Sequence, residues 1–325
     1  MAIGKGSDFK IYEEEFYGGM YEKVAQMTNG FNGAAAGTIQ LVAKELKGNY
    51  EKESFLKGLS SLITRRDLTS IAGATDIAMT QDELISVKIN RKIGPVAQTL
   101  DAWRKIGSDA REMSFKLGAM IGETKMQDYL NTALLGVEAS ITAVTLNNVD
   151  KTGATPDTLT HTYLVDGLAL MGDRSANIAM WVMHSKAYFD LVKQSISDKV
   201  FEVAGATIMN GNVASLGRPV LVTDAPALLE SGAPNVYPVL GLAVGAVTVT
   251  ESEKEEIVSE VVTGLEQLSF RVQGEYAFNV GVKGAKWDTT NGGVNPADGA
   301  VGTSTNWDQV ATSDKHTAGV RILVN

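Results

Sequence analysis

The sequence of 325 residues contains no cysteine and only three histidines. Without thiols there can be no disulfide, no thiolate nucleophile and no cysteine-ligated metal. The histidines His161, His184 and His316 are too scattered to predict a metal site, since zinc ligands usually occur at short spacings. The chain also lacks the phosphate-binding, dinucleotide-binding, zinc-protease, esterase and calcium-binding motifs. We therefore expect no metal, no cofactor and no catalytic residue.

Basic residues and long apolar runs are also scarce. Lysine and arginine total 29 against 38 aspartate and glutamate, a formal net charge of -9, which argues against a protein that wraps nucleic acid by neutralising phosphates. The most apolar window, residues 236–250, is interrupted by Pro238 and by glycines, and it is shorter than the ~20 residues that cross a bilayer. We expect no signal peptide, because the N-terminal residues lack an apolar core of the required length. A composition of 44% apolar and 21% charged residues is typical of a folded protein that stays out of the membrane.

The longest regular element that the sequence predicts is a helix over residues 108–139. Apolar residues recur there at spacings of three and four, and Ser108 is suited to cap the start. About 30 residues at a rise of 1.5 Å give a length on the order of 45 Å. Gly118 and Gly122 mark points of bending or close packing. Such a helix can serve as the spine of a domain.

Residues 61–106 are expected to form a long hairpin. Apolar and polar side chains alternate over residues 85–89, as they do in a strand with one solvated face. β-branched runs stand on both sides of a polar joint at residues 72–82, which predicts two paired strands. In an acidic protein the basic outward face is a candidate for contact with acidic surface on another copy, although a solvated hairpin would show the same pattern. The candidate interface residues are Arg65, Arg66, Lys88, Arg91 and Lys92.

The sharpest candidate for catalysis is the stretch MWVMHSKAYFDLV, residues 180–192, in which His184 stands beside Ser185. The apolar run over residues 178–183 predicts a buried strand, and the periodicity of residues 185–196 predicts an amphipathic helix. Neighbouring residues at a strand end point in different directions, so they rarely form the nucleophile and base of a hydrolase. We expect Ser185 to cap the helix beside a partly buried histidine.

The last third of the sequence is rich in glycine and in short β-branched runs. Asp224 is expected to cap the helical turn that follows it. The acidic run over residues 251–260 should be a solvated surface element. Residues 268–284 are expected to form two strands separated at Gly274, and residues 286–319 to form a long loop at a surface or an interface.

The order of these elements and four stretches of sequence resemble the major capsid protein of tailed bacteriophages, with its Hong Kong 97-like fold. The stretches are TQDELISVKINRKIGPVAQTLDAWRKIG before the long helix, AMWVMHSKAYFDLVKQ, LGRPVLVTDAPAL, and LSFRVQGEYAFNVGVKGAKWD near the C-terminus. Together they extend over most of residues 60–290. None is a catalytic signature, so the resemblance lies in their order and spacing.

The resemblance implies an α+β chain with an N-terminal arm, an extended β-hairpin loop, a long spine helix, and peripheral and axial domains. The implied boundaries are 1–60 for the arm, 61–106 for the extended loop, 107–175 for the spine helix and part of the peripheral domain, 176–265 for the axial domain, and 266–325 for the return to the peripheral domain.

The resemblance also implies a function. Many copies, arranged as pentamers and hexamers, would form the icosahedral head shell that encloses double-stranded DNA without reading its sequence. The chain would be made in the host cytoplasm and would act in the virion capsid. About 60 residues precede the hairpin, so a separate scaffolding protein is expected, with a portal and possible decoration proteins as further partners. An encapsulin-like nanocompartment shell is an alternative, and a hydrolase that uses His184 and Ser185 is a more distant one.

Overall fold

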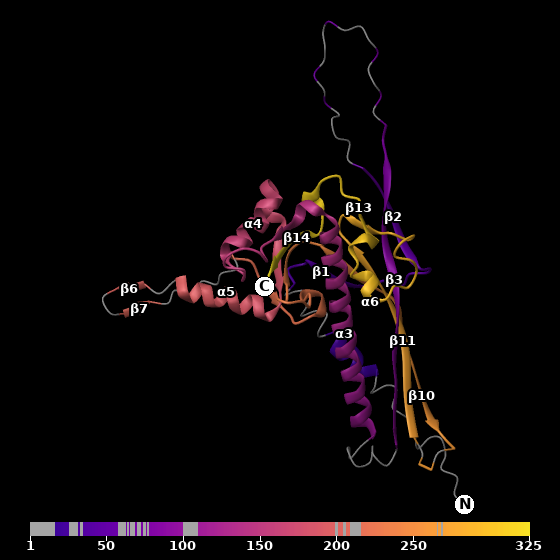
Figure 1. Ribbon diagram of the computed structural model, residues 1–325. Helices are drawn as coiled ribbons and strands as arrows, with labels where there is room; N and C mark the ends of the chain where they lie inside the picture. The colour runs from indigo at the N-terminus through magenta and orange to yellow at the C-terminus, as the bar shows by residue number, and fades with distance from the viewer. Residues whose placement is uncertain are drawn as a thin grey trace, which may run out of the picture.

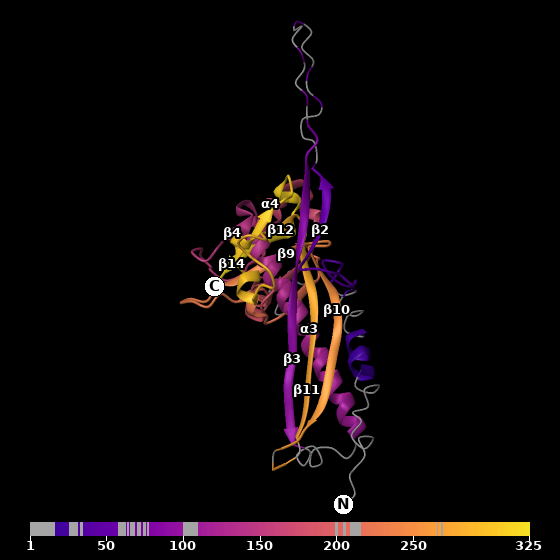
Figure 2. The same ribbon diagram turned by 90° about the vertical axis from the view of Figure 1, so that its right-hand side faces the viewer.

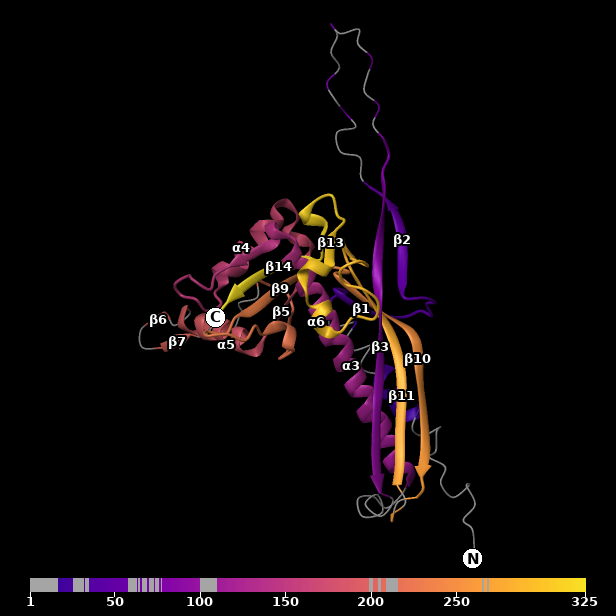
Figure 3. The ribbon, with the colours of Figure 1, turned by 45° about the vertical axis from the view of Figure 1, so that its right-hand side comes forward.

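The computed structural model describes residues 17–25, 35–57, 78–99, 110–198, 201–203, 206–208, 216–264 and 269–325, with a few isolated positions between them. In this part of the chain, two five-stranded sheets lie on either side of one long helix (Figures 1 and 3). No helix among the described residues is long and apolar enough to span a lipid bilayer.

The first sheet is built on three long strands that run side by side along the helix α3, Ala110–Ala143 (Figure 2). β1 runs parallel to β10, and the other neighbouring strands are antiparallel. The strand order is β1 (Ile39–Ala43), β10 (Val247–Val262), β11 (Ser269–Val282), β3 (Gln81–Thr99) and β2 (Tyr50–Leu56).

The second sheet lies on the other side of α3 and is covered on both faces. Met180 and Val182 belong to the core that includes α3, whereas Trp181 and Met183 pack with the helices α4 and α5. A strand buried on both faces reads as a continuous apolar run, as β5 does. The strand order is β4 (Asn148–Asp150), β14 (Gly319–Val324), β9 (Tyr237–Ala243), β5 (Ile178–Met183) and β8 (Val220–Val222); α4 is His161–Met171 and α5 is Ser185–Asp198.

Short elements complete the two lobes. Residues 286–319, expected to be a loop, instead contain short regular elements held by two buried tryptophans, Trp287 and Trp307, whose rings meet edge to face at 5.1 Å. The short elements are β6 (Phe201–Val203), β7 (Ala206–Ile208), β12 (Ala285–Trp287), β13 (Trp307–Gln309), α6 (Asp298–Val301), and the 3-10 turns η2 (Thr145–Asn147), η3 (Gly172–Asn177), η4 (Pro226–Leu228), η5 (Ser304–Asn306) and η6 (Asp314–His316).

Several predicted elements are confirmed and others differ. The long helix, the strand at 178–183 and the helix after it are present. Residues 269–282 form the single strand β11, so the predicted break at Gly274 is wrong. The strand that pairs with the start of β3 is β2, which lies before the range expected for the hairpin. The first strand expected for that hairpin lies largely outside the described residues.

Candidate assembly surfaces and the contacts that position them

His184 and Ser185 form a structural junction between β5 and α5. The His184 Nδ1 accepts a hydrogen bond from the Lys186 backbone N–H at 3.1 Å, and its Nε2 lies 3.4 Å from an Asp224 carboxylate oxygen. The Ser185 backbone N–H also donates to Asp224, at 3.2 Å. Hydrogen bonds from the Ser185 side chain and backbone hold the pKa of the Asp224 carboxyl below its usual value. The serine therefore bonds to the carboxylate, whereas a catalytic triad would bond it to the imidazole.

This junction corrects two predicted caps. Because α5 begins at Ser185, the residue before the helix is His184, and its ring nitrogen takes the capping role expected of the serine. The turn after Asp224 begins with Ala225 at its cap position and has no side-chain cap bond. Asp224 instead faces the start of α5, where a carboxylate is favoured by the helix dipole.

A buried lysine on α3 faces the acidic strand β10. The Lys125 side chain is 2% exposed and lies between the carboxylates of Glu251 and Glu255, the second at 2.5 Å. Burial opposes ionisation of Glu255, but the Lys125 ammonium outweighs it and holds the pKa of that carboxyl below its usual value. The rings of Tyr129 and Tyr276 lie 5.5 and 5.4 Å from the ammonium. The acidic run over residues 251–260 is therefore partly internal. The prediction that it is solvated holds only for its outward-facing residues.

Arg91 makes a second set of charged contacts along the same helix. Its Nε lies 3.0 Å from Asp128 on α3, and its guanidinium also bonds Thr132 at 3.1 Å and pairs with Asp298 on α6. Tyr276 donates to the same Asp128 carboxylate at 2.7 Å. These contacts tie β3, α3 and α6 together, so Arg91 belongs to the interior contacts of one chain.

The other candidate interface residues lie in different environments. Lys88 is 7% exposed and pairs with Glu253 on β10, so its charge is also matched within the chain. Arg65 and Lys92 are exposed. Arg66 lies outside the described residues. Lys88, Arg91 and Lys92 all fall on β3, in the part that pairs with β11, and so lie in the first sheet and not in a projecting loop.

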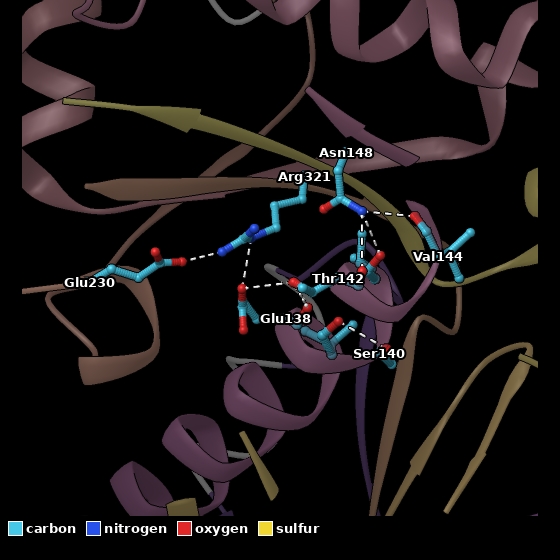
Figure 4. A network of polar contacts seen from close by, with 9 residues as sticks. Glu138, Ser140, Thr142, Val144, Asn148, Glu230 and Arg321 are labelled. Carbon is cyan, nitrogen blue, oxygen red and sulfur yellow. Dashed lines mark hydrogen bonds and ion pairs between the residues drawn. The ribbon is translucent and has the colours of Figure 1, made fainter. Parts of the chain in front are cut away.

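A third polar network joins α3 to the second sheet (Figure 4). Arg321 on β14 places its Nε 2.7 Å from Glu138 on α3 and also pairs with Glu230. Burial raises the pKa of Glu138, although the Arg321 guanidinium and the Thr142 hydroxyl oppose that shift. The Asn148 side-chain amide donates to the Val144 carbonyl at 2.8 Å and covers the end of α3. The network fixes how the second sheet meets the helix.

The sequence and the backbone arrangement have known relatives. A family model for the Major capsid protein 13-like family, Gp13-like, matches residues 8–321. The chain belongs to this family. It is therefore a major capsid protein, a shell-forming component of the virion, and this favours a virus capsid over the nanocompartment alternative. A search of curated proteins finds no match.

Solved phage structures share the fold of this capsid protein. The capsid asymmetric unit of cyanophage Pam1 aligns over 88% of both chains with a TM-score of 0.53 and 12% identity. A structure from Mycobacterium phage Bobi also aligns over 88% of both chains, with a TM-score of 0.51 and 10% identity. The predicted Hong Kong 97-like fold is confirmed.

Proposed function

We propose that this major capsid protein forms the pentamers and hexamers of an icosahedral shell that encloses double-stranded DNA. One observation carries the proposal: β3 pairs with a different strand toward each of its ends. Residues 81–87 of β3 pair with β2, and from Val87 onward the same strand pairs with β11. A continuous strand links the centre of the first sheet to the strand pair of β2 and β3 at its edge (Figure 1). An edge strand beside a rigid neighbour is suited to contact a neighbouring copy.

Exposed side chains beyond this strand pair support such contacts. Ile63 is 95% exposed, and a neighbouring copy that covered it would remove its apolar surface from water. Arg65 stands two residues later and is exposed as well. Exposed ion pairs contribute only about 0–1 kcal/mol each, so shell strength would come from repetition over many closed contacts.

The other parts of the proposal concern chemistry and partners. A structural role without catalysis is supported by the junction at His184 and Ser185, where the serine bonds to Asp224. The net charge of -9 suits a shell that encloses DNA without binding it tightly or reading its sequence. A separate scaffolding protein and a portal are the expected partners, with decoration proteins as possible further ones.

Charge reversal combined with electron microscopy tests the proposal. Arg65→Glu with Arg66→Glu, and separately Lys92→Glu, should lower the yield of shells while the melting temperature of the unassembled chain stays unchanged. Lys88→Glu and Arg91→Glu are the matched contrast, because each reversal would set like charges against Glu253 or Asp128 and destabilise the chain by about 1–3 kcal/mol. Normal shells from both exposed reversals would refute the interface role. A chain that stays monomeric even beside its scaffold would contradict shell formation.

A further inference from the structure

Residues 17–25 form a short helix that lies against α3 and β10, seen in indigo in Figure 2. Met20, on the inner face of this helix, is fully buried, and Val24 packs against the apolar core that includes α3. Tyr21, by contrast, is 51% exposed. The helix therefore packs against α3 and β10 with one face only.

Two glycines, one on each helix, allow this close approach. A Cβ added at Gly19 would stand 2.7 Å from the Phe115 carbonyl oxygen, a distance that real Cβ atoms do not tolerate. A Cβ added at Gly122 would stand 3.2 Å from the Met20 carbonyl oxygen and 3.3 Å from Val24. At Gly18, one position away, an added Cβ meets no described atom within 4 Å. The fit is thus specific to the face that carries Gly19.

Polar contacts join the same helix to β10. The Tyr17 hydroxyl accepts a hydrogen bond from the Ile257 backbone N–H at 3.4 Å. The Tyr21 hydroxyl bonds to the carboxylate of Glu255, which is also the partner of Lys125. The attraction within an ion pair is strong in a low-dielectric surrounding, and it offsets the cost of burial only when the remaining hydrogen-bonding positions are filled. The helix helps to meet both conditions for Lys125 and Glu255.

Most of the stability of a helix in a folded protein comes from the packing of one face and not from intrinsic propensity, because the first turn is costly to nucleate. The helicity of residues 17–25 therefore depends on docking. We propose that these residues are a reversible latch: their docking holds the N-terminal half of α3 against β10 and keeps the Lys125 and Glu255 pair dry. Docking and the strength of the pair are then coupled, and each favours the other.

Hydrogen exchange on the unassembled full-length chain tests the latch with a matched pair of variants. Alanine favours a helix over glycine at both Gly18 and Gly19, but only Gly19→Ala creates a clash. Gly19→Ala should speed amide exchange about tenfold or more at residues 17–25, 115–127 and 253–262, while Gly18→Ala leaves it unchanged or slower. β9 and β14 in the second sheet should keep their protection in both variants.

A milder variant keeps the test decisive if Gly19→Ala fails to fold. Tyr21→Phe removes only the hydroxyl that bonds Glu255, and it should speed exchange in the same segments by a smaller factor. Equal exchange in Gly18→Ala and Gly19→Ala would overturn the latch. So would a loss of protection spread evenly over β9 and β14, since residues 17–25 would then add only to global stability. Shell formation, scored separately by electron microscopy, is not required for either result.

Discussion

The first sheet meets α3 through buried charged and aromatic side chains in addition to apolar ones, whereas the second sheet meets α4 and α5 through apolar side chains. Lys125 and Glu255 are almost fully buried between α3 and β10. In the second lobe the corresponding contacts come from Leu164, Trp181 and Ile322, all with no exposed surface. The same chain thus uses two kinds of interior on its two sides.

This difference has a physical consequence for alignment. Apolar contacts are non-directional, so a helix on an apolar sheet can shift slightly at low cost. An ion pair with filled hydrogen-bonding positions has a narrow geometry, and a shift leaves a buried charge unmatched. We infer that the charged contacts set where α3 lies along β10, and that the apolar contacts supply most of the stability of the second lobe.

The largest expected effect on stability concerns the apolar core of the second lobe. Trp181→Ala should lower the free energy of unfolding by about 4 kcal/mol, because it removes a fully buried side chain and leaves a cavity. Denaturant unfolding of the unassembled chain measures this loss. Phe189→Ala on α5 is the control, since that ring is 58% exposed and its loss should be nearly neutral. A loss below about 1 kcal/mol for Trp181→Ala would contradict the assignment of stability to this core.

The buried ion pair between α3 and β10 should affect stability differently when one partner is replaced and when both are. Lys125→Met leaves Glu255 buried without a cation and should cost about 3 kcal/mol. The double variant Lys125→Met with Glu255→Leu should recover most of that loss, because an apolar pair replaces the ion pair. Glu123→Gln, at an exposed position of the same helix, is the control. If the double variant is as unstable as the single one, the ion pair contributes to the stability of the chain and not only to the position of α3 along β10.

The smallest expected effect concerns an ion pair near the Gln81 end of the β2 and β3 strand pair. Asp82 lies 2.8 Å from Lys57 and 3.4 Å from Lys286, and the hydrogen bond from Lys57 is the main cause that lowers the Asp82 pKa to about 2. A lowered carboxyl pKa adds stability above its ordinary value of 3.8, and that stability is lost as the pH falls through 2. Asp82→Asn should therefore cost about 0.5–1 kcal/mol near neutral pH and nothing below pH 2.

Unfolding measured at both pH values, with an NMR titration of the Asp82 carboxyl, checks this prediction. Asp82→Asn should lower stability near neutral pH only. An ordinary carboxyl pKa, or an equal loss of stability at both pH values, would show that the strand pair is not held by these lysines.

Local patterns predicted the helix α3 and the junction of β5 with α5, because their periodicity is set by residues close in the sequence. β2 was missed because its sequence, YEKESFL, has three charged residues in a row and little apolar alternation. It is a strand because it pairs with the edge of β3, which no local pattern reveals. The continuity of β11 through Gly274 also depends on a neighbouring strand. Gly274 packs against Ile257 of β10 without room for a side chain.

The buried charges were missed for a related reason. Lys125 lies four residues before Tyr129 and three after Gly122, so helical spacing already placed it on the buried stripe of α3. That spacing is the signal that could have identified it. Its partners Glu251 and Glu255 lie more than 120 residues further along the chain, and their distance depends on the register of β10.

The sequence by itself determined the elements with strong local periodicity, the absence of cysteine chemistry and the order of segments that resembles a capsid protein. The tertiary structure alone decided which basic residues are exposed. Lys88, Arg91 and Lys92 lie within five residues of one another on β3, yet the first two are paired inside the chain and the third faces solvent. Alternation can place a side chain on a face, but only packing determines what covers that face and which charge meets it.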